Sequence, residues 1–273
     1  MGFLMSENAP RRALVAKRTR WLRDFFARPC SSPIFILGNQ KSGTSAIASL
    51  LGEMTGKSVA VDLAKDFHAP AFQRVGRQMS LAEYRRLNAV EFSKDIIKEA
   101  NLTPMFDDLR SSYSDARFVF VVRDPRTNIR SILQRLDLSG RPEEVDSSAL
   151  QDISETWRLI LDSGWLGISG DDYVTRLASR WQLFSDIASS NVDDFQIIRY
   201  EDFLVDKVGS IERLVDGLSL DRVHDIAEQT DIQYQAKGDH SVSLNAFFGA
   251  RNLERIDAIC KKGMRFFRYA RGA

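Results

Sequence analysis

The fold follows from one stretch of sequence, Ile34-Phe35-Ile36-Leu37-Gly38-Asn39-Gln40-Lys41-Ser42-Gly43-Thr44-Ser45. Its first four residues are all apolar, which is typical of a short strand buried on both faces. Apolar residues then recur at helical spacing from Ser45 to Met54, and Gly56 is a stop signal. The stretch therefore predicts a strand, a glycine-containing loop and a helix.

The loop in this stretch is a predicted anion site. Backbone N–H groups at the start of a helix are unpaired and lie at the positive end of the helix dipole. Gly38 and Gly43 let the chain turn tightly, and Lys41 adds a positive charge. Thr44 and Ser45 add hydroxyl donors. The alternative is a surface turn with a solvated lysine, and the position between a buried strand and an apolar helix disfavours it.

The loop differs from the loop that binds ATP. That loop needs the pattern Gly-x-x-x-x-Gly-Lys-Ser/Thr. Gly38 and Gly43 have this spacing, but Thr44 takes the place of the lysine, which has moved inside the loop as Lys41. No Lys-Ser/Thr pair remains to manage a metal-bound triphosphate, which disfavours a kinase.

The rest of the chain alternates between short strand and helix patterns. Strands are predicted at Val59–Val61, Ala89–Phe92, Arg117–Val122 and Phe195–Ile198. Helices are predicted over 81–87 and 126–135 and around Trp157 and Trp181, with a solvated loop over 137–149. This alternation predicts an α/β protein with a three-layer, P-loop-like fold, in which helices flank a central, mainly parallel sheet.

Length and patterning predict one main domain. The chain has 273 residues, enough for a substantial single core. Residues 1–30 are expected to form a basic amphipathic helix, and residues 31–273 a single domain. The apolar side of that helix either packs on the body of the protein, or its arginines bind an acidic surface or partner.

Composition narrows the function classes. A formal net charge of +1, from 38 basic and 37 acidic residues, gives no overall field for binding nucleic acid, so we expect no nucleic-acid partner. No apolar run is long enough to span a bilayer, so stable membrane insertion is not expected. Two isolated cysteines, Cys30 and Cys260, favour a reducing compartment, which we expect to be the cytoplasm.

Two motifs give the chain a specific resemblance. Gln40-Lys41-Ser42-Gly43-Thr44-Ser45 resembles the 5′-phosphosulfate loop of sulfotransferases that use the nucleotide donor PAPS. A second motif follows about 80 residues later, with Arg123 at the end of a predicted strand and Ser131 on the next helix. It is similar to the element of that family that binds the 3′-phosphate. An arginine fork and a hydroxyl donor suit a phosphate, although Arg123 could instead pair with an acid.

The resemblance extends over about residues 33–270 and implies further donor contacts. Tyr200, in Arg199-Tyr200-Glu201-Asp202, resembles the family's Tyr-Glu-Asp element, and we interpret the two acids as loop braces. Lys237 and Gly238 are similar to the family's Lys-Gly segment over the nucleotide. Many cytosolic members stack an aromatic residue on adenine where this chain has Ala46. Trp181 or Tyr200 is then left to hold the base.

The resemblance also implies a catalytic scheme. Lys41 is expected to stabilise the bridging oxygen, and no metal is expected. Cytosolic members carry a histidine base after a strand lysine, but the matching stretch, taken here as 93–96, has no histidine. The carbohydrate-modifying branch uses a glutamate after the second strand, and Lys65-Asp66-Phe67-His68 is similar to that segment. Asp66 and His68 are therefore the candidate bases, and the chain is closer to the bacterial and carbohydrate-modifying branch.

The sequence leaves the acceptor open. A carbohydrate, a lipid headgroup or a small alcohol or amine fits the scheme equally well, and a homodimer is also left open. Two other functions remain as alternatives: a P-loop kinase for a small molecule and a non-catalytic nucleotide-binding module.

Overall fold

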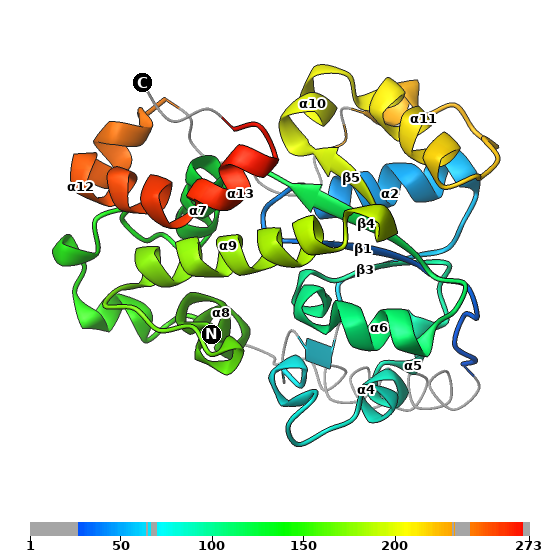
Figure 1. Cartoon of the computed structure of the whole chain (residues 1–273), viewed down its shortest axis with the longest axis horizontal. Helices are drawn as coiled ribbons and strands as arrows, with labels where there is room; N and C mark the ends of the chain where they lie inside the picture. The colour runs from blue at the N-terminus through cyan, green and yellow to red at the C-terminus, as the bar shows by residue number, and fades with distance from the viewer. Residues whose placement is uncertain (1–26, 64, 67–69, 231, 233–240, 270–273) are drawn as a thin grey trace, which may run out of the picture.

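The computed structural model describes residues 27–63, 65–66, 70–230, 232 and 241–269. His68, Lys237 and Gly238 lie outside these residues, as does nearly all of the predicted basic helix of residues 1–30. The described residues surround one sheet (Figure 1). The division of the chain into 1–30 and 31–273 stays a prediction.

Five parallel strands form the central sheet, in the order β2-β3-β1-β4-β5. They are β1 (Ile34–Gly38), β2 (Val59–Val61), β3 (Ile96–Lys98), β4 (Arg117–Val122) and β5 (Phe195–Arg199). The first strand, β1, lies in the middle of the sheet. Strands β2 and β3 lie on one side of β1, and β4 and β5 lie on the other. Ligands of open parallel sheets bind beyond the carboxyl ends of the strands at the point where the strand order reverses, which here is the loop after β1.

Helices cover both faces of this sheet, so the predicted three-layer fold is confirmed. Ile34 and Ile36 of β1 pack with one core cluster, to which α2 (Thr44–Thr55), α10 (Tyr200–Val205) and α11 (Lys207–Gly217) contribute. Phe35 and Leu37 point to the opposite face, because successive strand residues alternate. There they pack with a cluster that includes α4 (Leu81–Leu87), α6 (Phe106–Ser112) and α9 (Tyr173–Ser190).

The remaining helices complete the layers and the region beside them. They are α5 (Ala89–Phe92), α7 (Pro125–Arg135), α8 (Glu155–Asp162), α12 (Leu244–Ile259) and α13 (Lys261–Phe266). Short 3-10 turns lie at Phe72–Arg74, Ala100–Met105, Pro142–Glu144, Ser147–Leu150, Gly164–Leu166, Val192–Asp194 and Ala227–Gln229. Helix α9 contacts α7, α8, α12 and α13, and the five helices gather beside the sheet in Figure 1.

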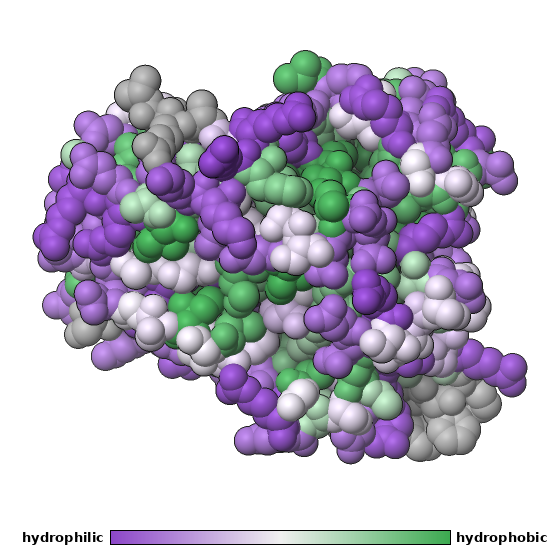
Figure 2. Space-filling view, in the orientation of Figure 1, coloured by the Kyte–Doolittle hydropathy of each residue, from purple (hydrophilic) through white to green (hydrophobic). Residues whose placement is uncertain are grey.

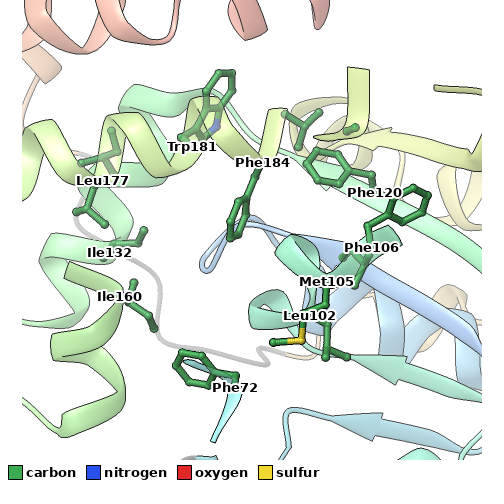
Figure 3. Close-up of a cluster of buried hydrophobic side chains, with 14 of the residues drawn as sticks. Phe72, Leu102, Met105, Phe106, Phe120, Ile132, Ile160, Leu177, Trp181 and Phe184 are labelled. Atoms are coloured by element: carbon green, nitrogen blue, oxygen red, sulfur yellow. The ribbon is translucent and has the colours of Figure 1, made fainter. Parts of the chain in front are cut away.

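Aromatic side chains fill the core on the α9 side of the sheet. Phe106 of α6 lies 5.0 Å from Phe118 and 4.5 Å from Phe195, measured between ring centroids. These contacts hold α6 against β4 and β5, because large buried rings contribute most of the apolar area of a core. Figure 3 shows Trp181 and Phe184 leaving α9 in different directions, so this helix is buried on more than one side.

Two predictions about the middle of the chain are wrong. Residues Ala89–Phe92 form helix α5 rather than a strand, and they continue from α4 after Asn88. The third strand is Ile96–Lys98, so 93–96 is mostly the turn that precedes β3. Periodicity cannot separate a four-residue buried helix turn from a short strand, and that ambiguity explains the error. The other predicted strands are confirmed within one residue at each end.

Candidate anion and sulfuryl-transfer site

Two glycines allow the loop after β1 to pack closely against its neighbours. Gly38 has a φ of 138°, and a Cβ there would lie 2.3 Å from the carbonyl oxygen of Val121 on β4. Gly43 has a φ of 92°, and a Cβ there would lie 2.3 Å from the ring of Tyr200. Both positions require glycine, because other residues rarely adopt this backbone and would also clash.

Side chains from two other segments, the 3-10 turn Ala100–Met105 and helix α7, fix the loop. The amide of Gly38 donates to Thr103 Oγ1 at 3.0 Å, and Gln40 Nε2 donates to Asn101 Oδ1 at 2.8 Å. From α7, Asn128 Nδ2 donates to the carbonyl of Gln40 at 2.8 Å and to Ser42 Oγ at 3.1 Å. The loop therefore has a fixed shape, as a preorganised anion site requires.

A cavity of about 540 Å³ opens beside this loop. Because β1 lies between β3 and β4 in the sheet, the lining residues fall on two sides of the loop. Its lining on the side of β4 and α7 includes Arg123 and Ser131. Its lining on the side of β2 and β3 includes Asp62, Asp66, Lys98 and Glu99. The loop itself contributes Gln40, Lys41, Gly43, Thr44 and Ser45 to the same cavity. Ser42, which is fully buried, is not among the lining residues.

Positive charges gather in this cavity. Burial, together with the nearby charges of Arg135, Arg123 and Lys98, lowers the pKa of Lys41 from 10.5 to about 8. A group of like charges that repel one another in a partly buried site is stabilised by a bound anion. The electrostatics therefore indicate an anionic ligand at the start of α2.

Arg123 lies at the end of β4 as predicted, and its partners are neutral. Its NH1 donates to the carbonyl of Lys41 at 2.9 Å, and its Nε donates to Thr127 Oγ1 at 3.1 Å. The guanidinium lies 4.8 Å from the ring centroid of Tyr200, and burial lowers its pKa. The acid next in sequence, Asp124, pairs instead with Arg126. Arg123 thus stays directed at the loop, and the acid-pairing alternative is not the arrangement observed.

The two acids after Tyr200 differ in their contacts. Glu201 Oε1 accepts from the amide of Asp124 at 2.9 Å, and its Oε2 accepts from the hydroxyl of Tyr269 at 2.8 Å. Glu201 therefore braces the turn after β4, as the sequence interpretation holds. Asp202 pairs at 3.4 Å with Arg199 on the surface.

Tyr200 and Trp181, the two predicted candidates for holding adenine, have different surroundings. Tyr200 lines the cavity beside Ala46, Leu204 and Ile232. Trp181 is 2% exposed, and its Nε1 donates to the carbonyl of Arg123 at 2.9 Å. Trp181 is thus a core residue that supports Arg123 from behind. Hydrophobic surface is also visible in Figure 2 where Figure 1 places α10 and β5.

Asp66 lies in the cavity lining but is tied into the fold. Its Oδ1 accepts from the amide of Ala71 at 2.6 Å, and its Oδ2 accepts from the hydroxyl of Tyr84. Burial raises the pKa of Asp66, while the Tyr84 and Ala71 hydrogen bonds oppose that rise. Of the two candidate bases, only Asp66 is among the described residues.

Sequence reasoning missed two charged residues, Lys98 at the end of β3 and Glu99 directly after it. Lys98 pairs with Asp62, and Glu99 accepts from the amides of Leu63 at 3.2 Å and Asn101 at 2.9 Å. Burial, together with the charge of Asp62, raises the pKa of Glu99 to about 7 against the opposing charge of Lys98. The signal available in the sequence was the apolar pair Ile96-Ile97 directly before them, which none of the predicted strands includes as a pair.

Taken together, a parallel α/β sheet and a cationic loop at its central strand define a protein that binds an anionic, phosphate-like group. The sulfotransferase domain family matches residues 31–246, so the chain belongs to that family. A comparison with curated proteins finds no match.

Two solved structures share the fold. Sulfotransferase STF1 from Mycobacterium tuberculosis H37Rv aligns at 16% identity with a TM-score of 0.52, over 91% of this chain and 81% of that one. Sulfotransferase STF9 from Mycobacterium avium aligns at 13% identity with a TM-score of 0.54, over 96% and 82%.

Within the described residues, no three His, Cys, Asp or Glu side chains come together as a metal site needs. No helix in that part of the chain is long and apolar enough to cross a bilayer.

Proposed function

We propose that the protein transfers a sulfuryl group from PAPS to a hydroxyl or amine acceptor, in line and without a metal. The observation that carries this proposal is the placement of Lys41 and Arg123 in one cavity at the start of α2, with the pKa of Lys41 held at about 8. Such a site favours a ligand with more than one anionic group, and PAPS has a 5′-phosphosulfate and a 3′-phosphate.

The donor contacts follow from the two sides of the cavity. In the predicted loop, Gln40, Lys41, Gly43, Thr44 and Ser45 would hold the 5′-phosphosulfate, and Ser42 would support the loop from behind through Asn128. Arg123 and Ser131 would bind the 3′-phosphate through a fork of N–H donors and a hydroxyl. Tyr200 would lie against adenine, with Ala46 leaving space on the other side. Lys237 and Gly238 remain proposed contacts on the basis of sequence alone.

In the proposed reaction, the bond between sulfur and the bridging phosphate oxygen breaks while a bond from the acceptor oxygen to sulfur forms. Lys41 neutralises the charge that develops on the bridging oxygen, and the products are PAP and a sulfate ester. The acceptor hydroxyl gives up its proton to a base on the β2 and β3 side.

A carboxylate on that side is the proposed base. The sequence puts forward Asp66 and His68, and the structure adds Glu99. General bases work best with a pKa near the operating pH. Glu99 has this property, because burial and the charge of Asp62 raise its pKa more than the hydrogen bonds from the amides of Leu63 and Asn101 lower it.

The base assignment predicts a pH effect. Glu99→Gln is expected to lower kcat by about 10² and to remove the acidic limb of the pH–rate profile. Wild-type activity should fall as pH drops below about 7, because protonated Glu99 cannot accept a proton. The measurement is kcat against pH with PAPS and each alcohol or phenol that is sulfated.

Asp66→Asn is the matched control for this change. If Asp66 is the base, Asp66→Asn removes the acidic limb and Glu99→Gln keeps it. A limb that persists in both variants would direct the search to His68.

The acceptor is proposed to enter on the side of Leu63, Trp157 and Ile160, which give this part of the cavity an apolar and aromatic wall. A sugar ring, a lipid headgroup or a small alcohol or amine can lie against such a wall. A cytoplasmic location, the absence of a nucleic-acid partner and a homodimer stay proposals from the sequence.

Donor identity is tested by thermal unfolding with PAP, with ATP and Mg²⁺, and without ligand. A ligand that binds only the native state raises Tm, and at 100 times its Kd it adds about 2.7 kcal/mol. We expect PAP to raise Tm and ATP with Mg²⁺ to have little effect. The reverse result would support the kinase alternative, and PAP binding without transfer to any acceptor would support the binding module.

A further inference from the structure

A buried arginine lies behind the anion loop. Arg180 is on α9, between residues that face the core, and its exposed fraction is 0%. Charged side chains are almost never fully buried unless a partner of opposite charge accompanies them. The partners of Arg180 are therefore informative.

Each polar partner of Arg180 is neutral. Its NH2 donates to Gln40 Oε1 at 3.2 Å and to Asn101 Oδ1 at 3.1 Å, and its NH1 lies 3.5 Å from Ser163 Oγ. The guanidinium also lies 4.5 Å from the ring centroid of Phe184. Within the described part of the chain, no carboxylate forms an ion pair with it.

This arrangement destabilises the protein without ligand. Removing a cation from water without a counter-ion costs several kcal/mol, even after the surroundings relax. Burial accordingly lowers the pKa of Arg180 to about 9, while the charge of Glu99 acts in the opposite direction. An apolar side chain of similar size would fill the same space without that cost, so stability alone does not explain an arginine here.

Arg180 is connected to the cavity through two residues that line it. Gln40 and Asn101 both belong to the cavity lining, and they are hydrogen-bonded to each other at 2.8 Å. Gln40 directly precedes Lys41, and its carbonyl is held by Asn128 at 2.8 Å. The positive charge of Arg180 thus lies one layer behind the loop, with neutral amides between it and the ligand.

We propose that Arg180 is a buried positive charge that the anionic donor neutralises when it binds, so that Arg180 strengthens donor binding and weakens the ligand-free fold. Arg180 is a positioning residue rather than a catalytic one, because Gln40 and Asn101 separate it from the cavity. The inference rests on the proposed function for the identity of the donor. It needs only an anion in the loop for its physical basis.

Arg180→Met tests the proposal, because methionine is neutral, unbranched and similar in length. PAP is expected to bind the variant about 10- to 100-fold more weakly in low salt, the range for one buried charge acting over several ångströms. The ligand-free variant is expected to have a Tm equal to or above that of wild type. Titration calorimetry gives the Kd, and scanning calorimetry gives the Tm.

A structural brace would behave in the opposite way. In that case Arg180→Met would lower the ligand-free Tm and leave the Kd for PAP unchanged, which would overturn the proposal. The matched control is Arg176→Met, four residues earlier on α9, where the guanidinium donates to the carbonyl of Gly170 at 3.0 Å. This control should change the Kd for PAP by less than about threefold.

Arg180→Lys separates charge from hydrogen bonding and decides the question if Arg180→Met does not fold. A lysine keeps the charge when the titration is run at about pH 5, below the range to which burial lowers a lysine pKa, but it cannot reach Gln40 and Asn101 together. A Kd for PAP within about threefold of wild type supports the proposal even where the Tm falls. A loss of about tenfold or more overturns it.

Titration of the same variants with inorganic pyrophosphate separates this inference from the donor assignment. If wild type binds pyrophosphate but not PAP, the proposed donor is wrong, and the loss of pyrophosphate binding in Arg180→Met still supports the buried charge. If wild type binds neither, both proposals fall.

Discussion

Replacing Lys41 with alanine is expected to lower kcat by about 10³, a loss of about 4 kcal/mol of transition-state stabilisation. The ammonium group is the charge in the loop that can follow the bridging oxygen as it becomes negative. At pH 7, Lys41 is mostly protonated because its pKa of about 8 lies above that pH, and a bound anion raises the pKa further. The measurement is the transfer of label from ³⁵S-PAPS to water and to a panel of alcohols, phenols and sugars.

Lys57→Ala is the matched control for this change, because Lys57 follows the other end of α2 and lies outside the cavity lining. It should leave kcat within about twofold of wild type. Equal activity of wild type and Lys41→Ala would contradict the mechanism. A rise in KM for PAPS with unchanged kcat would show instead that Lys41 contributes only to binding.

Local sequence was enough to predict the centre of the fold. In Ile34–Ser45 the apolar run, the two glycines and the following helix pattern agree on one structure, and the structure contains it. The same agreement holds for β4 and Arg123, where a strongly apolar strand ends at Asp124-Pro125, a helix start. Strands buried on both faces are predictable because nearly every residue in them is apolar.

The third strand was not predictable in this way. Ile96–Lys98 has three residues, and its last one is charged, so it carries little of that signal. Ala89–Phe92 is more apolar, but it follows α4 and continues as helix. Pairing with β1 and β2 decides which segment becomes the strand, and these partners are distant in sequence.

The site residues that belong to a local sequence motif were predictable. The site residues that only the tertiary structure brings together were not. Lys41 and Arg123 are recognisable because each follows a clear strand within three residues. Glu99 became apparent only with the position of β3. Arg180 lies on a helix with several partly buried polar residues, and nothing in its local pattern distinguishes a solvated arginine from a buried one.

Arg123→Ala is expected to weaken PAP binding by about 10²–10³, with a smaller effect on kcat once PAPS is saturating. Arg123 is 7% exposed, so Arg123 and the 3′-phosphate would form a buried pair of hydrogen-bonded charges. Removing one partner of such a pair costs about 2–5 kcal/mol of binding free energy. Ser131→Ala should cost about tenfold or less, because a single hydroxyl donor to a charged group contributes about 1.5 kcal/mol. Both values come from titration calorimetry with PAP.

Two variants make the cause of this loss clear. Arg123→Lys keeps the charge but loses the planar fork, and it is expected to recover only part of the affinity. Arg117→Ala removes the arginine at the opposite end of the same strand, where the side chain donates to the carbonyl of Leu218. It should lower Tm without changing the Kd for PAP. If Arg117→Ala and Arg123→Ala weaken PAP binding equally, Arg123 acts on the stability of β4 rather than on the 3′-phosphate.

A comparison with adenosine 5′-phosphosulfate, which lacks the 3′-phosphate, shows whether Arg123 contacts that phosphate. Arg123→Ala should leave the Kd for adenosine 5′-phosphosulfate nearly unchanged.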